Sequence, residues 1–198
     1  MSGERKRQIL EVLAAELESR PGSRISTAEL AAAVGVSEAA LYRHFPSKAR
    51  MFEGLIEFAE HSIFGLFNQV MAEQRDAVTR CQHLAFALLR FAERNPGIAR
   101  ILMGDILTGE HERLRARVMQ FYARVETQFK QALREANLEQ PAALDAPTIA
   151  ATAALLVAVV AGKVDQFVRS DFKQPPTAQF EAQWRLMCGG LFAATVPA

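Results

Sequence analysis

The sequence predicts an all-α protein of about nine helices, in which a small three-helix N-terminal domain precedes a larger helical domain. Apolar residues recur at spacings of three and four along nearly the whole chain, which is the period of one helix face. Stop signals such as Pro21-Gly22 and Pro175-Pro176 separate these stretches. No segment alternates with the period of two that indicates a strand. The predicted domains are residues 1–50 and 51–198.

The first three helices are short and have clear predicted boundaries. The first helix ends before Pro21, and its apolar stripe contains Ile9, Leu10, Val12, Leu13 and Leu17. Ser26 begins the second helix, because its hydroxyl and the Glu29 side chain three residues later can form a capping box. Gly35 ends this helix, since glycine readily adopts the positive φ of a sharp turn. Ser37 caps the third helix, which ends before the next proline.

Six further helices are predicted in the rest of the chain. Their approximate ranges are residues 48–73, 76–94, 98–103, 110–137, 145–172 and 177–192. Ser47 and Thr177 are expected to cap the helices that follow them. The helix that begins at Asp145 is apolar nearly all round, and such a helix must be buried on several sides.

The most informative stretch is residues 25–50, which has the composition of a helix-turn-helix. The helix after Ser37 is expected to enter the major groove of DNA. Arg43 has the planar fork that reads guanine O6 and N7, whereas Thr27, Tyr42 and Lys48 are better suited to phosphates. The complete set of predicted DNA-binding residues is Thr27, Ser37, Ala39, Ala40, Tyr42, Arg43, His44 and Lys48. An antiparallel helix pair that does not bind DNA is the alternative.

The same stretch resembles a known family. Its Thr27, Glu29-Leu30-Ala31, Val34-Gly35-Val36-Ser37, Leu41-Tyr42-Arg43-His44-Phe45 and Ser47-Lys48 resemble the N-terminal signature of TetR-type regulators. Further segments are similar to the nucleoid occlusion branch of that family, whose members bind scattered chromosomal sites and antagonise the division protein FtsZ. They are Glu38–Lys48, Leu55–Phe58, Glu93–Gly97 and Phe167–Ser170. The similarity is weaker over residues 65–82 and 138–151, and the basic arm expected before the first helix, Arg5, Lys6 and Arg7, is short for the family.

The resemblance implies a homodimer that binds palindromic double-stranded DNA, as one dimer or as a dimer of dimers. The last two helices of each subunit would form the interface, and the apolar helix from Asp145 favours this independently. The expected interface residues are Leu155, Leu156, Val159, Val160, Phe167, Trp184, Leu186 and Leu191. An internal core helix of a monomer is the alternative.

The resemblance also implies a second partner, the short, acidic and apolar C-terminal tail of FtsZ. Phe58 and Arg94 match residues of the surface that contacts this tail, and Asn95 lies beside them. Phe58 also falls on the apolar stripe of its helix, so the sequence leaves open whether it is a core or a surface residue.

A ligand-responsive repressor is the rival function. A small-molecule pocket in the larger domain would be lined by aromatic and apolar residues, for which the candidates are Phe86, Phe91, Met103, Phe121, Tyr122 and Phe129. Empty volume there would favour this function, and a filled core would favour a protein that binds partners.

Several classes of protein are not expected. The sequence has no nucleophile elbow, phosphate-binding loop, dinucleotide-binding glycine motif or zinc-protease motif, so we expect neither an enzyme nor a metal or cofactor site. Cys81 and Cys188 are not paired by spacing. The N-terminus lacks the apolar segment of a secretory signal, and the apolar run 149–162 is shorter than the ~20 residues of a membrane span. A cytoplasmic, nucleoid-associated protein without a membrane partner is expected.

Overall fold

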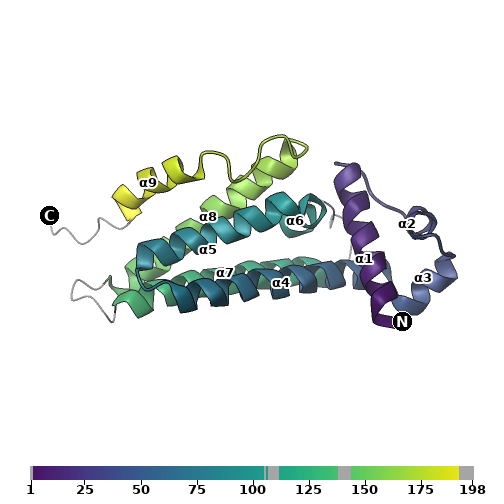
Figure 1. The fold of residues 1–198 in the computed structure, drawn as a ribbon, viewed down its shortest axis with the longest axis horizontal. Coiled ribbons are helices and arrows are strands. Elements are labelled where there is room, and N and C mark those ends of the chain that lie inside the picture. Colours follow the sequence, from purple (N-terminus) through teal and green to yellow (C-terminus); the bar gives the residue numbers. More distant parts are fainter. Residues whose placement is uncertain (1, 105, 107–111, 138–143, 192–198) are drawn as a thin grey trace.

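The computed structural model describes residues 2–104, 106, 112–137 and 144–191, and these residues form nine helices and no strand (Figure 1). The predicted all-α class is therefore confirmed. The helices are α1 (Ser2–Ser19), α2 (Thr27–Val34), α3 (Glu38–His44), α4 (Lys48–Glu73), α5 (Ala77–Arg94), α6 (Pro96–Met103), α7 (Glu112–Asn137), α8 (Ala146–Arg169) and α9 (Phe180–Leu191).

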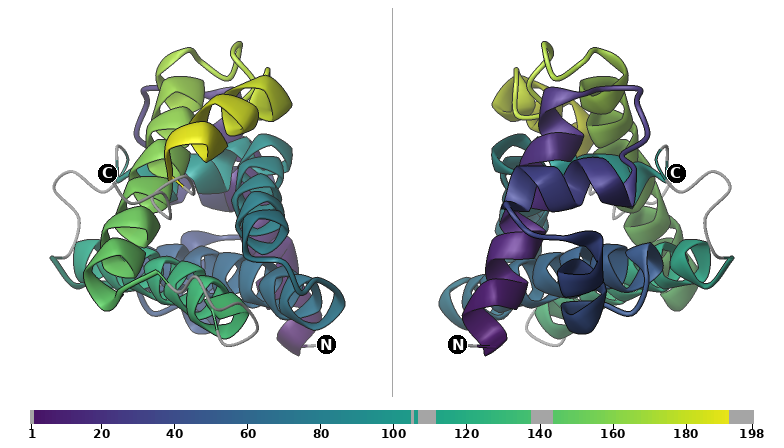
Figure 2. Two further views of the ribbon diagram at one scale, coloured as in Figure 1. Left: turned by 90° about the vertical axis from the view of Figure 1, so that its left-hand side faces the viewer. Right: turned by 90° about the vertical axis from the view of Figure 1, so that its right-hand side faces the viewer.

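The long helices form the body of the molecule, and α1, α2 and α3 lie together at one end of it (Figure 1). In the body, α4 contacts α5 and α7, and α7 also contacts α5 and α8. The right-hand view of Figure 2 looks onto the end of the molecule that carries α1, α2 and α3. Helices α2 and α3 lie beside α1, on the side of α1 that faces away from the body (Figures 1 and 2). This arrangement leaves α2 and α3 accessible while α1 contacts both groups of helices.

One hydrophobic core runs through both predicted domains. Apolar side chains of α1, including Ile9 and Leu17, belong to the same cluster as Phe129 on α7 and Trp184 on α9. Helix α1 contacts α6 of the body as well as α2, α3 and α4. Because burial of apolar surface is the main stabilising contribution to a fold, this continuity keeps α1 in contact with the body.

Most predicted helix starts are confirmed by side-chain caps. Asp76 accepts a hydrogen bond of 2.7 Å from the Thr79 backbone N–H, and Asp145 accepts one of 2.8 Å from that of Thr148. The prediction for Thr177 was wrong. Its hydroxyl donates to Glu93 on α5 instead, and α9 begins only at Phe180.

Helix α8 is covered on one side and open on the other in the single chain. Its main contacts are with α5, α6 and α7, and its Lys163 ammonium also donates a 2.6 Å hydrogen bond to the Gln183 side chain on α9, whereas Leu155 is 48% exposed. Within the single chain, the predicted burial therefore applies to the face of α8 that is turned toward these helices. Among the described residues, α8 is the one helix whose length and composition would allow it to cross a membrane. This is weak evidence, because apolar core helices pass the same test.

Candidate nucleic-acid interface and a second groove

Local capping fixes the geometry of α2 and α3. The Ser26 hydroxyl accepts a hydrogen bond from the Glu29 backbone N–H, and the Glu29 carboxylate accepts one from the Ser26 N–H, so the predicted capping box is present. Gly35 ends α2 with φ 76°, in the left-handed region that favours glycine. Ser37 then caps α3 by accepting from the Ala40 N–H at 3.2 Å.

These hydrogen bonds hold the pKa of the Glu29 carboxyl below its usual range. The largest cause is the Ser26 backbone N–H, followed by the Ser26 hydroxyl and the Arg20 guanidinium. The carboxylate therefore stays charged at the start of α2, where the helix dipole favours a negative charge.

The predicted base-reading side chains lie on the outer face of α3. Ala39, Tyr42 and Arg43 are exposed, and Ala40 and His44 are half-buried. Ser37 is exposed, but its hydroxyl is already engaged as the cap of α3. Arg43 is thus the longest side chain with hydrogen-bond donors on this face of the helix.

Two predicted phosphate contacts have partners within the protein. The Thr27 hydroxyl on α2 donates to the Glu38 carboxylate on α3 at 3.0 Å. The Lys48 ammonium lies 5.3 Å from the centroid of the buried Phe52 ring. Glu38 was not among the predicted site residues, although its place directly after the helix cap puts it at the end of α3 that faces α2.

The basic residues near the N-terminus do not form an arm. Arg5, Lys6 and Arg7 lie inside α1, which already begins at Ser2. Lys6 reaches the end of α3, where its ammonium is 5.9 Å from the centroid of the Phe45 ring. The expectation of a short basic arm before the first helix was therefore wrong.

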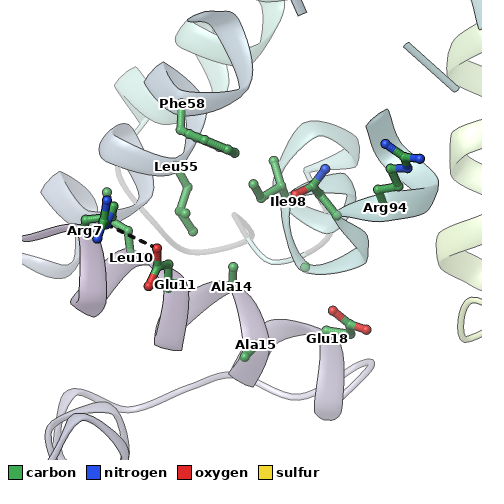
Figure 3. A pocket seen from close by; sticks show the side chains of 12 residues that line it. Arg7, Leu10, Glu11, Ala14, Ala15, Glu18, Leu55, Phe58, Arg94 and Ile98 are labelled. Atoms are coloured by element: carbon green, nitrogen blue, oxygen red, sulfur yellow. Dashed lines mark ion pairs between the residues drawn. The ribbon is translucent and has the colours of Figure 1, made fainter. Parts of the chain in front are cut away.

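A second candidate site is a groove between α1, α4 and the junction of α5 with α6, which we call the composite groove. Its volume is about 370 Å³. Side chains from the three walls face a common space in Figure 3. The lining residues are Arg7, Leu10, Glu11, Ala14, Ala15, Glu18, Leu55, Phe58, Arg94, Asn95, Gly97 and Ile98.

All three predicted partner-binding residues line this groove. Phe58 is 50% exposed, so it is a surface residue rather than a core residue, and its ring centroid is 6.3 Å from that of Phe91. Arg94 is exposed at the end of α5. Asn95 is half-buried, and its side-chain amide donates to the Phe91 carbonyl at 2.8 Å, which caps α5.

The groove combines an apolar floor with charged edges. Leu55 and Ile98 are buried at its base. Arg7 and Glu11 form an ion pair of 3.5 Å along the α1 edge, and Arg94 stands at the opposite wall (Figure 3). Half of the lining residues belong to α1, and sequence reasoning missed them. No local pattern reveals them, because the contact joins segments far apart in the chain.

The predicted dimer-interface residues fall into two groups. Leu186 is 81% exposed, Leu155 is also exposed, and Val159 is half-buried. The others are buried within the subunit itself, namely Leu156, Val160, Phe167 and Trp184. The side chain of Leu191 lies outside the described residues.

The candidate small-molecule pocket does not coincide with any of three cavities lined by described residues. None of the three described cavities includes Phe86, Phe91, Met103, Phe121, Tyr122 or Phe129. Phe121 and Phe129 have no exposed surface and belong to the hydrophobic core. The Tyr122 hydroxyl is buried and has no hydrogen-bond partner among the described residues, and this burial raises its pKa.

Two family models match the chain. Residues 9–55 match a model described as bacterial regulatory proteins of the tetR family, and residues 75–191 match one described as a tetracyclin repressor-like C-terminal domain. Two solved structures of low identity share the fold. The MbdR regulator from Azoarcus sp. CIB has a TM-score of 0.77 at 17% identity and covers 96% of this chain and 98% of its own. FadR from Bacillus subtilis, solved with stearoyl-CoA, has a TM-score of 0.73 at 13% identity over 93% of this chain and 98% of its own.

Full-length relatives are much closer in sequence. The nucleoid occlusion factor SlmA of Shewanella woodyi is 57% identical over 180 residues, which cover 91% of each chain. That of Colwellia psychrerythraea is 55% identical over 183 residues, which cover 92% of each chain. The chain therefore belongs to the TetR family of bacterial DNA-binding regulatory proteins, in the branch of the nucleoid occlusion factors.

Proposed function

We propose that this nucleoid occlusion factor acts as a cytoplasmic homodimer that binds palindromic sites on the nucleoid through α2 and α3. We further propose that it captures the C-terminal tail of FtsZ in the composite groove. Bound along the chromosome, it antagonises FtsZ ring assembly there. The observation that carries the partner half of this proposal is the half-exposed Phe58, which stands in a charged, apolar-floored groove.

The DNA half of the proposal depends on α3. Arg43 reads a guanine edge, while Tyr42, Lys48 and the backbone N–H groups at the start of α4 contact phosphates. Those N–H groups follow Ser47, whose hydroxyl already accepts from the Arg50 N–H at 3.2 Å. Because much of this binding neutralises phosphates, affinity falls steeply as salt is raised.

Dimerisation uses the open face of α8 together with α9, which we call the apolar face. It carries the exposed Leu155 and Leu186 and the half-buried Val159 and Met187. An exposed apolar strip on two adjacent helices is typical of a protein interface. Two subunits joined there present two copies of α3 to half-sites about one helical turn of DNA, or ~34 Å, apart.

The composite groove suits a short acidic and apolar peptide. An apolar side chain of the peptide packs on Phe58 above Leu55 and Ile98, and the peptide carboxylates pair with Arg94 and Arg7. Large exposed aromatic residues and arginines contribute most to affinity in such interfaces. Glu11 and Glu18 on the α1 wall oppose any acidic residue placed near them, which fixes the direction of the peptide.

Sedimentation of FtsZ polymers tests the complete proposal. The protein together with a DNA duplex that it binds is expected to reduce the sedimented fraction, and the Phe58→Ala variant with the same duplex is expected to leave it unchanged. No effect of the unmodified protein, with or without DNA, would contradict the proposal.

A ligand-responsive repressor remains the second candidate, favoured by one observation. The buried Tyr122 hydroxyl lacks a hydrogen-bond partner among the described residues, and a buried polar group of this kind is costly unless something else binds it. Release of bound DNA by a small molecule, with loss of that release in Tyr122→Phe, would support this candidate over FtsZ antagonism.

A further inference from the structure

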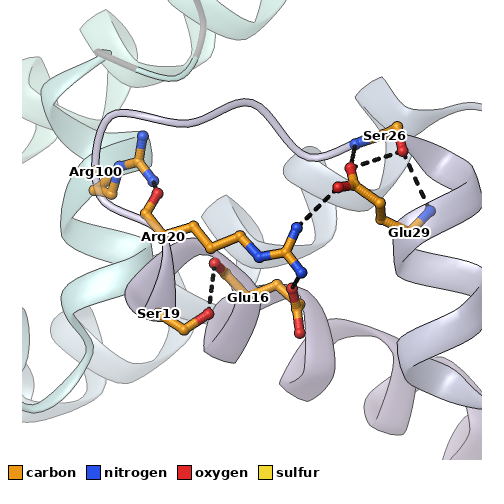
Figure 4. Close-up of polar contacts among 6 residues, drawn as sticks. All are labelled: Glu16, Ser19, Arg20, Ser26, Glu29 and Arg100. Atoms are coloured by element: carbon orange, nitrogen blue, oxygen red, sulfur yellow. Dashed lines mark hydrogen bonds and ion pairs between the residues drawn. The ribbon is translucent and has the colours of Figure 1, made fainter.

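Arg100 on α6 is an arginine buried between the DNA-binding helices and the body. Its side chain is only 1% exposed. Nη1 donates hydrogen bonds of 2.9 Å to the backbone carbonyls of Leu17 and of Arg20, and Nη2 donates one of 3.3 Å to that of Ser23. Figure 4 shows its guanidinium directed toward the end of α1. These acceptors precede Arg100 by 77 to 83 residues.

The acceptors explain why an arginine occupies this position. The last carbonyls of a helix lack partners within the helix, and α1 ends at Ser19. The partial negative charge at a helix C-terminus also favours a cation. A planar guanidinium can donate to several carbonyls at once in a fixed geometry, which a lysine ammonium on its flexible chain does not reproduce. Helix α6 therefore supplies the C-terminal cap of α1.

The same chain segment continues to α2. The Arg20 guanidinium pairs with Glu16 on α1 at 3.3 Å and with Glu29 on α2 at 2.9 Å (Figure 4). Glu29 in turn completes the capping box of α2. Polar contacts thus lead without a gap from α6, through the end of α1, to the first turn of the helix-turn-helix.

Close backbone contact supports this connection. A Cβ at Gly97 on α6 would lie 2.1 Å from the Ala14 carbonyl oxygen on α1, so only glycine permits the observed approach. Gly97 and Ala14 also line the composite groove. The contact between α6 and α1 is therefore shared by the DNA-binding helices and the groove.

We infer that Arg100 is a positioning residue for DNA recognition, because it fixes the orientation of α1, α2 and α3 relative to the body. Its loss leaves the recognition surface itself intact. The loss of Arg100 allows α1, α2 and α3 to move together relative to the body. The distance between the two copies of α3 in a dimer is then no longer fixed.

The chain offers a matched control in Arg80. This side chain is also buried, and it caps a helix C-terminus by donating to the Gln74 carbonyl at 2.7 Å and to the Met71 carbonyl at 3.2 Å. Those carbonyls belong to the end of α4, inside the body. Arg80→Gln therefore removes the same kind of cap without touching α1.

The first experiment measures the orientation directly and needs neither DNA nor a dimer. Spin labels are attached at the exposed positions Ala33 on α2 and Ala123 on α7, both changed to cysteine in a Cys188→Ser chain. The labelled chain is diluted with unlabelled chain, and pulsed electron resonance gives the distance distribution. Arg100→Gln is expected to broaden the distribution, and Arg80→Gln is expected to leave it narrow. Equal widths in Arg100→Gln and the parent, or equal broadening in Arg80→Gln, would overturn the inference.

A second variant, Arg100→Lys, keeps the inference testable if Arg100→Gln does not fold. Its ammonium keeps the charge and part of the hydrogen bonding, so its distribution is expected to lie between those of the parent and Arg100→Gln. If circular dichroism shows that Arg100→Gln has lost helix content, the test is the comparison of Arg100→Lys with the parent. Distance distributions of equal width in these two proteins would overturn the inference.

The second experiment depends on the proposed DNA binding. Palindromic duplexes selected from random DNA by the parent protein are lengthened at their centre by one base pair. We expect Arg100→Gln to lose about tenfold or more of the parent's preference for the original spacing, while its affinity for a single half-site is unchanged. An unchanged preference for spacing would overturn the inference. Absence of DNA binding by the parent would refute the proposed function and leave the distance measurement valid.

Discussion

The hydroxyl of Thr27 on α2 donates a 3.0 Å hydrogen bond to the carboxylate of Glu38 at the start of α3. This contact ties the two helices of the helix-turn-helix together on the face proposed to meet DNA. It also places a negative charge there, close to where phosphates would lie. The charge lowers affinity for every DNA sequence, because a carboxylate repels phosphate without regard to the bases.

The first prediction follows from this charge. Glu38→Gln is expected to bind both a selected palindrome and a random duplex several-fold more tightly, as measured by fluorescence anisotropy. Glu73→Gln makes the same charge change at an exposed position near the end of α4 and is expected to leave both affinities unchanged. Weaker or unchanged binding of both duplexes by Glu38→Gln would contradict this prediction.

Arg43 and Lys48 are expected to have different roles in DNA binding. Arg43→Ala should lose about 1–3 kcal/mol of discrimination between the selected palindrome and random DNA, because a bidentate contact to guanine is lost. Lys48→Ala should weaken binding to all sequences alike and reduce the salt dependence. Competition binding against both duplexes measures the ratio. Equal losses of discrimination in the two variants would contradict this division.

The apolar face predicts which exposed residue holds the dimer together. Leu186→Asp is expected to be monomeric at concentrations where the parent is dimeric, since burying a leucine contributes ~1.5–3 kcal/mol and a buried unpaired charge opposes association. Met119 on α7 is similarly exposed, at 73%, and lies outside this face, so Met119→Asp is expected to remain dimeric. Light scattering after size-exclusion chromatography reports the mass. Identical masses for the two variants would refute the interface.

The capping box predicts a dependence of stability on pH. The pKa of Glu29 is lowered from 4.5 in the folded protein, so the unfolded chain binds more protons, and stability falls as pH drops below 4.5 through the folded pKa. Glu29→Gln removes this contribution. When the pH is lowered from neutral to well below 4.5, the free energy of unfolding should therefore decrease less in Glu29→Gln than in the parent. Urea unfolding at both pH values measures the difference, and parallel pH profiles would contradict it.

Local signals explain why the fold was predictable from the sequence. Ser26 with Glu29, Ser37 and Asp145 cap helices through groups three residues away, and such short-range chemistry is visible in the sequence. Thr177 has the same composition signal, but its hydroxyl is engaged by Glu93, which lies 84 residues earlier in the chain. The prediction of its cap failed because a tertiary contact competes with the local one.

The candidate site was less accessible to sequence reasoning for the same physical reason. The position of a residue along a helix does not determine which neighbouring helix covers its side chain. The sequence alone therefore leaves undetermined whether Phe58, on the apolar stripe of α4, is exposed, and the packing of the helices determines it. The α1 wall of the composite groove and the burial of Arg100 also depend on contacts between distant segments. Leu156 and Trp184 were assigned to a dimer interface by their apolarity, and the single chain already buries them.

The most direct measurement of the central claim is binding of a fluorescent peptide with the sequence of the FtsZ C-terminal tail. Phe58→Ala is expected to weaken this binding at least about tenfold, which corresponds to ~1.4 kcal/mol. Leu66→Ala changes another exposed apolar residue of α4, one that does not line the groove, and is expected to bind as the parent does. Equal affinities for the parent and Phe58→Ala, or equal losses in the two variants, would contradict the account.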